Sequence, residues 1–213
     1  ASYWSGALTP KNCRSRSGAR TTGSAGLKLN LVIRVYATKK LRSKLPLGEN
    51  DALPAVRPAK APLPKNPLNG WHANLITLQR RQCVLFVHNY SRFALIIPCL
   101  KKPDFVSLDW HFEDVLMNTL LRTGMPEDTI TRAANSIEPL QFDHPMDRSV
   151  MGTLNQLAAD VEHQLWYENK DVGELLPYRT SAWLSERPCH VKGRKDCIWP
   201  IDSLKEILDR TVH

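Results

Sequence analysis

The stretch that decides the fold runs from Asn69 to Pro98 and reads NGWHANLITLQRRQCVLFVHNYSRFALIIP. It contains three apolar runs, HANLITLQ, CVLFVHN and FALIIP. Short runs rich in β-branched and aromatic residues are typical of strands, and continuous apolar runs indicate strands that are covered on both faces. Arg80-Arg81 separates the first two runs as a hairpin would, and NYSR separates the last two. We therefore predict a three-stranded antiparallel meander.

Further elements are predicted on both sides of this meander. The run LVIRVY indicates another strand of the same sheet, and TKKLRSKL indicates a short helical turn after it. Downstream, the apolar spacing becomes helical, and Asp147 is placed to cap the longest helix. The predicted helices cover about 110–123, a short segment from Pro126, 148–166 and 200–210. The fold class predicted is α+β, with a small, mostly antiparallel sheet packed against three or four helices in a single domain, 31–213.

Two segments are predicted to lie outside the packed core. Residues 1–30 are rich in Ser, Gly, Ala, Thr and Arg and contain no acidic residue and no apolar period. We expect them to be a disordered or non-native extension whose deletion leaves stability nearly unchanged, with a nucleic-acid-binding arm as the alternative. Residues 46–68 contain six prolines, which is typical of an extended, exposed connection.

The charge of the chain is unevenly distributed. The formal net charge is +8, but residues 1–65 hold 13 Lys/Arg and 2 Asp/Glu, whereas residues 66–213 hold 16 and 19. A basic face is the usual footprint of nucleic-acid binding. The charge of the folded body does not support a nucleic-acid partner, although it leaves room for a local basic patch.

Composition indicates a cytoplasmic protein without a membrane partner. Apolar residues make up 42% of the chain, as in ordinary globular proteins, and no stretch is long and apolar enough for a membrane helix or a signal peptide. The five cysteines are an odd number, and Cys83 and Cys99 lie in apolar runs. This pattern favours reduced thiols.

No motif predicts a cofactor, a metal or a catalytic nucleophile. The chain contains no P-loop, no dinucleotide-binding glycine motif and no nucleophile elbow. Cys189, His190 and Cys197 lack the tight paired spacing of structural zinc sites. We therefore expect no cofactor and no metal, and the sequence assigns no catalytic residue.

The best candidate site combines polar residues of the meander with the start of the long helix. Exposed N–H groups at a helix N-terminus favour an anion. If the elements meet, they would form a pocket for a phosphate or carboxylate, and Arg148→Ala would lose the ligand at little cost in stability. The alternative is structural, with Arg148 paired to Asp143 or Asp147. The candidate anion-binding or ligand-binding residues are His72, Asn74, Arg80, Arg92, Arg148 and Ser149.

The same segments carry a family resemblance. VYATKKL, WHANLITLQRRQCVLFVHNYSRF, LKKPDF and DRSVMGTLNQLAADVEH occur in this order. Together they resemble the bacterial family known as domain of unknown function 6933, from about Ile33 to the last helix. His88 and Tyr90, and the long proline-rich insert, depart from the family pattern. The resemblance implies a small cytoplasmic bacterial protein, in some cases plasmid-borne, and it supplies no activity and no catalytic residue.

Two classes of function remain open from the sequence. The first is a non-enzymatic binding or accessory module of mobile or defence-related gene sets, whose partner is an unknown protein or an anionic ligand. The second is an enzyme that acts on a phosphorylated or nucleic-acid substrate through the cluster of His72, Arg80 and Arg148. Loss of turnover in His72→Ala with the fold intact would favour the enzyme, and persistent binding would favour the module.

Overall fold

Strands β2, β3 and β4 form the antiparallel meander that the central stretch predicts. The structure is a computed structural model that describes residues 32–48, 53, 66–144, 147–191 and 195–210. The strands are β1 (Ile33–Ala37), β2 (Trp71–Leu78), β3 (Arg81–His88), β4 (Ala94–Leu100) and β5 (Leu140–Asp143). The helices are α1 (Lys39–Arg42), α2 (Leu108–Arg122), α3 (Glu127–Asn135), α4 (Arg148–Tyr167), α5 (Pro177–Ser185) and α6 (Pro200–Asp209), with short 3₁₀ turns η1 (Lys102–Phe105) and η2 (Val172–Glu174).

The five-stranded sheet is mixed, which corrects the prediction of a mostly antiparallel one. Its order is β4-β3-β2-β1-β5. Strand β1 pairs in parallel with β2, with Tyr36 opposite His72, and in parallel with β5, with Tyr36 opposite Asp143. Parallel neighbours require a long connection instead of a tight turn, and α1 together with residues 46–68 provides it between β1 and β2. The short run LVIRVY did not indicate this direction.

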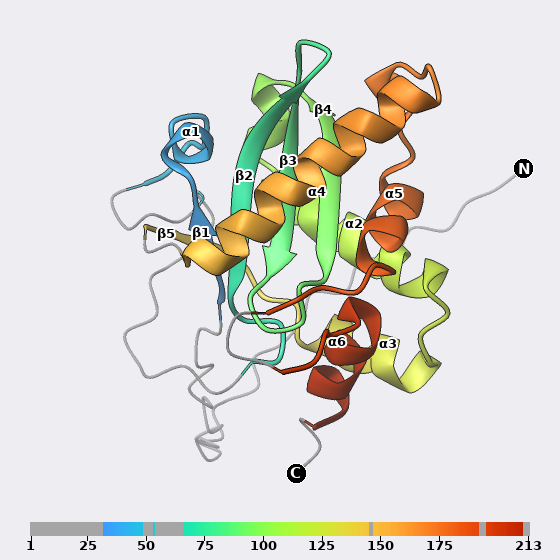
Figure 1. Ribbon diagram of the computed structural model, residues 1–213. Helices are drawn as coiled ribbons and strands as arrows, with labels where there is room; N and C mark the ends of the chain where they lie inside the picture. The colour runs from blue at the N-terminus through green and yellow to red at the C-terminus, as the bar shows by residue number, and fades with distance from the viewer. Residues whose placement is uncertain (1–31, 49–52, 54–65, 145–146, 192–194, 211–213) are drawn as a thin grey trace, which may run out of the picture.

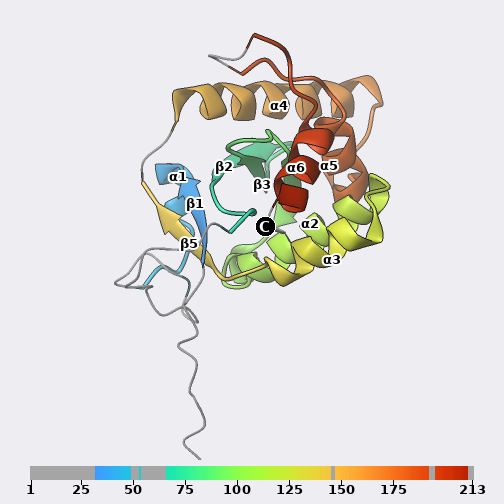
Figure 2. The ribbon, with the colours of Figure 1, turned by 90° about the horizontal axis from the view of Figure 1, so that it is seen from below.

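Helices cover both faces of the sheet. Figure 2 shows α4 on one side of the strands and α2 and α3 on the other. Side chains of the meander alternate between two cores: Leu85 and Val87 pack with α4, whereas Val84 and Phe86 pack with α2. On the α2 face, the ring of Phe112 makes edge contacts with Phe86 and Trp71 at 5.2 and 5.1 Å.

The helix count exceeds the predicted three or four, since the described residues contain six α-helices. Helix α4 begins as predicted, because the Asp147 carboxylate accepts the Ser149 N–H at 2.7 Å. Helix α5 was not predicted and lies along β4, where it meets the edge of the sheet (Figure 1). There the hydroxyl oxygens of Ser185 and Ser181 accept hydrogen bonds from the N–H groups of Ala94 and Ile96, both at 3.0 Å.

The described part of the chain therefore forms a single α+β domain. Within it, no helix has the length and apolar character needed to cross a membrane. The predicted N-terminal extension, residues 1–30, and most of the proline-rich connection lie outside the described residues.

Candidate functional site

The six candidate residues lie in two places on the sheet. His72, Arg92 and Ser149 lie together at the N-terminus of α4, with Asn74 two positions further along β2 on the same face. Arg80 follows the opposite end of β2, eight residues from His72, which corresponds to roughly 25 Å of extended strand. The structure therefore does not bring Arg80 into one pocket with the other five.

His72 ties the sheet to the start of α4. Its ring Nε2 accepts a hydrogen bond from the Asp147 N–H at 2.8 Å, and its Nδ1 lies 2.5 Å from Asn89 Oδ1. Because a backbone amide only donates, Nε2 carries no proton, and Nδ1 must be the donor to Asn89. Burial lowers the pKa of His72, while the hydrogen bond to Asn89 and the charge of Asp147 oppose this shift. The ring is therefore neutral, and both of its nitrogens are occupied.

The glycine before this strand makes the contact with Asn89 possible. Gly70 has a φ of +93°, and its carbonyl oxygen accepts the Asn89 N–H at 2.8 Å. A Cβ at this position would approach Asn89 Nδ2 to 3.0 Å. Gly70 thus supports the turn and holds the Asn89 amide beside His72.

The other residues at this end are also held by internal contacts. Arg92 is only 3% exposed, has a φ of 62°, and donates from its guanidinium to Ser149 Oγ at 3.1 Å. The Thr38 hydroxyl donates to Asn74 Oδ1 at 3.0 Å. Arg148 is exposed at the first position of α4, and no salt bridge among the described residues includes it. These hydrogen bonds connect the β1–α1 junction, β2, the β3–β4 turn and the start of α4. They hold these elements of the fold together.

A neighbouring histidine is buried in the same way. His88 is fully buried, with Nδ1 2.8 Å from Ser91 Oγ and Nε2 3.3 Å from the Asn69 carbonyl oxygen. Burial lowers its pKa to about 4, so the ring is neutral at physiological pH. Across the described residues, no group of three or more His, Cys, Asp or Glu side chains could hold a metal ion.

A concave basic surface lies at the other end of the sheet, and we call it the basic groove. It has a volume of about 620 Å³ and is formed around the β2–β3 turn, the end of α1 and the β4–η1 junction. Its lining includes the buried Phe105 and Leu100 and the partly exposed Cys99. Ten described residues line it; among these, five are basic and none is acidic: Lys44, Arg80, Arg81, Lys101 and Lys102.

The backbone at the basic groove is held in uncommon conformations. Gln79 and Arg80 both have positive φ, 44° and 67°, as a type I′ hairpin turn requires. The Gln79 side chain fixes this turn, because its amide donates to the Lys170 carbonyl at 2.9 Å and accepts the Val172 N–H at 2.7 Å. Cys99, with a φ of 56°, lies where the β3–β4 register shifts. Non-glycine residues in such conformations concentrate at functional sites.

Acidic neighbours compensate only part of this positive charge. The Asp171 carboxylate lies 3.9 Å from the Arg81 guanidinium, and both side chains are more than half exposed. The Asp104 carboxylate accepts the backbone N–H of Lys101 at 2.7 Å. Lys44, Arg80 and Lys102 form no salt bridge among the described residues. The basic groove thus presents several exposed cations to a ligand.

A larger groove of about 790 Å³ lies between the hairpin and the C-terminal part of α4. Its lining mixes Glu162 and Asp171 with Lys170, and it includes the exposed ring of Trp166. Because both signs of charge are interspersed, it shows no preference for one class of ligand.

These observations define a single α+β domain with a mixed sheet, an internally bonded polar cluster at one end and a basic groove at the other. The model of the family described as Domain of unknown function (DUF6933) matches residues 34–203, so the chain belongs to this family. The match confirms the resemblance carried by the sequence motifs, and it covers both the polar cluster and the basic groove. No curated protein and no solved structure matches the chain.

Proposed function

We propose that this DUF6933 protein is a non-enzymatic binding module whose basic groove takes an anionic, phosphate-bearing ligand. The observation that carries the proposal is the gathering of five basic side chains around a concave volume of about 620 Å³, with no acidic one among the described lining residues. Hydrogen bonds from Lys and Arg to phosphate oxygens are about twice as strong as neutral ones. An isolated surface ion pair contributes little binding energy, but several like charges around one concavity sum to a stronger potential that attracts an oppositely charged ligand.

The alternative is an enzyme that acts on a phosphorylated or nucleic-acid substrate through the His72 cluster. A general base must reach the proton that it removes with a free nitrogen. His72 already uses Nε2 for the Asp147 N–H and Nδ1 for Asn89, and it is 1% exposed. The geometry therefore favours the binding module over this enzyme.

The proposal includes the cellular setting that the sequence suggested, a bacterial cytoplasm and a mobile or defence-related gene set. Its support is the family resemblance described above. Identification of the neighbouring genes, combined with a pull-down from the native host, tests this part. Neighbours and captured proteins that belong only to core metabolism would contradict it.

The direct experiment is a calorimetric titration of the full chain with inorganic tripolyphosphate at low salt. Wild type is compared with the double variant Arg80→Gln/Lys102→Gln, both of whose positions are exposed and line the basic groove. The matched control is Arg122→Gln/Lys205→Gln, which removes the same charge from exposed positions on α2 and α6. We expect the groove variant to lose about tenfold or more in affinity, since each charged hydrogen bond contributes roughly 1.5–3 kcal/mol. Equal affinities of the two variants would refute the proposal.

A further inference from the structure

We infer that the ligand of the basic groove is a nucleic-acid strand, bound through successive phosphates and without reading of its bases. This inference rests on the proposed function and adds the class of ligand. The net charge of residues 66–213, with 16 Lys/Arg and 19 Asp/Glu, did not support a nucleic-acid partner. The structure nevertheless brings several basic side chains together at one end of the sheet.

The cations are spread along a track and do not surround a single point. Lys44 follows α1, Arg80 lies in the β2–β3 turn, and Lys101 and Lys102 follow β4. Neighbouring strands are about 4.8 Å apart, so the distance from β2 to β4 alone is about 10 Å. The positions along this track match a ligand with several phosphates in sequence better than a single phosphate ion, which has room for few cations.

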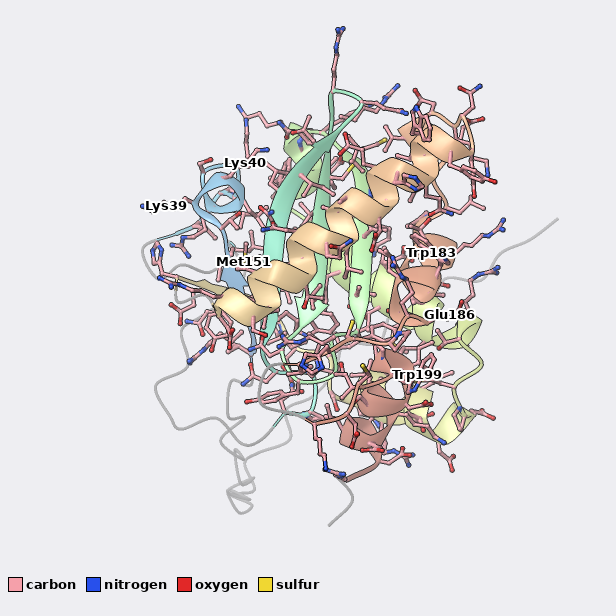
Figure 3. All side chains as sticks on the ribbon, viewed as in Figure 1. Lys39, Lys40, Met151, Trp183, Glu186 and Trp199 are labelled. Carbon is pink, nitrogen blue, oxygen red and sulfur yellow. The ribbon has the colours of Figure 1, made fainter. Side chains whose placement is uncertain are left out.

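The track continues onto α1 beyond the basic groove itself. Figure 3 shows Lys39 and Lys40 on α1, in the half of the molecule that holds the β2–β3 turn. Lys40 Nζ lies 3.3 Å from Thr77 Oγ1 of β2, which fixes this helix beside the end of the strand. α1 has no acidic residue in its first turn, and Lys39, Lys40 and Arg42 are basic. A nucleic-acid strand that runs from α1 to η1 would pass basic side chains of α1, the β2–β3 turn and the β4–η1 junction.

The lining of the basic groove offers phosphate contacts and no platform for bases. Phe105 is the one aromatic residue among the described residues that line it, and it is 1% exposed, so no base can stack on it. Single-strand binders that prefer certain bases rely on exposed aromatic rings. Binding through cations alone depends on the phosphate backbone, which makes it independent of sequence and steeply dependent on salt.

The experiment is fluorescence anisotropy of the full chain with fluorescein-labelled oligonucleotides of equal length and different sequence, over a series of KCl concentrations. With single-stranded oligonucleotides we expect equal affinities for all sequences and a log–log salt slope of at least about 2 in magnitude; the five groove cations alone would contribute up to about 3.5, at about 0.7 each, and contacts to α1 would add to this. Arg80→Gln/Lys102→Gln should weaken binding by about tenfold or more and reduce the slope by about 1.4. The control Arg122→Gln/Lys205→Gln should keep the wild-type slope.

Three outcomes would overturn the inference. The groove variant leaves residues 1–30 unchanged, so unaltered oligonucleotide binding would assign that binding to the leading basic segment. Tripolyphosphate binding that is lost in the groove variant, together with no oligonucleotide binding by wild type, would leave the proposed function standing and refute the nucleic acid. A strong preference for one sequence would also contradict backbone-only binding.

Discussion

Substitution of His72 by leucine tests whether this histidine is a structural tie between the sheet and α4. Leucine keeps an apolar side chain against Tyr36, whose ring lies 5.0 Å from that of His72, but it can make neither hydrogen bond. The Asp147 N–H and Asn89 Oδ1 would each lose a partner, and both contacts are partly buried. A buried polar group left without its partner costs about 1–3 kcal/mol. Since both groups gain some access to water, we expect His72→Leu to destabilise the fold by about 2–3 kcal/mol.

The assay is urea denaturation followed by far-ultraviolet circular dichroism, with the free energy of unfolding extrapolated to zero denaturant. The matched control is His163→Leu, because His163 is exposed on α4 and should change stability by less than about 0.5 kcal/mol. A loss below about 0.5 kcal/mol for His72→Leu would refute the structural role and reopen His72 as a functional group.

Three further predictions concern the same end of the sheet. The pKa of His88, lowered to about 4, means that the unfolded chain binds more protons than the folded one between pH 6.5 and 4; stability should fall on acidification over this window by at most on the order of 3 kcal/mol, and a pH series of urea melts on His88→Gln should show a flatter dependence. Gly70→Ala should cost about 1–3 kcal/mol because of its positive φ and the close Asn89 amide, whereas Gly152→Ala, in open space within α4, should stabilise by up to about 1 kcal/mol; thermal melts in which the two variants behave alike would contradict this. Arg148→Ala should lower the free energy of unfolding by less than about 0.5 kcal/mol because the residue is exposed; a loss of several kcal/mol in a denaturation experiment would instead indicate a buried ion pair.

Local patterns in the sequence predicted the meander and most of the long helices. The apolar runs before and after Arg80-Arg81 became β2 and β3, with the turn one residue earlier, at Gln79 and Arg80. The Asp147 cap and the apolar stripe of α4 were sufficient to place that helix. These features depend on neighbours within a few residues, which a sequence displays directly.

Non-local pairing explains what the sequence did not reveal. Strand β5 has only four residues, Leu140–Asp143, and it pairs with β1, more than a hundred residues away. Helix α5 has serines at positions 181 and 185 where a buried helix usually has apolar residues, because these hydroxyls bond to β4. Neither preference is visible before the partner strand is known.

The candidate site shows the same division. Sequence reasoning expected His72, Asn74 and Arg148 near one another at the start of the long helix, and the structure places His72 at the α4 N-terminus through its hydrogen bond from the Asp147 N–H. Binding of an anion at these residues stays a prediction. Sequence reasoning missed the basic groove, because Lys44, Arg80 and Lys102 come from separate segments and no short motif joins them. The net charge of residues 66–213 did not reveal it either, because 19 acidic residues offset the 16 basic ones there.

The serine contacts of α5 have a consequence for how this protein avoids self-association. β4 is an edge strand, and its Leu95, Ile96 and Ile97 are apolar and buried. Ser181 and Ser185 occupy its outward N–H groups, which would otherwise form a template for strand addition by another chain. At the opposite edge, β5 offers only four residues. The nine-residue helix α5 therefore covers the edge at which a strand of another chain could add to the sheet, and loss of its contacts would expose that edge.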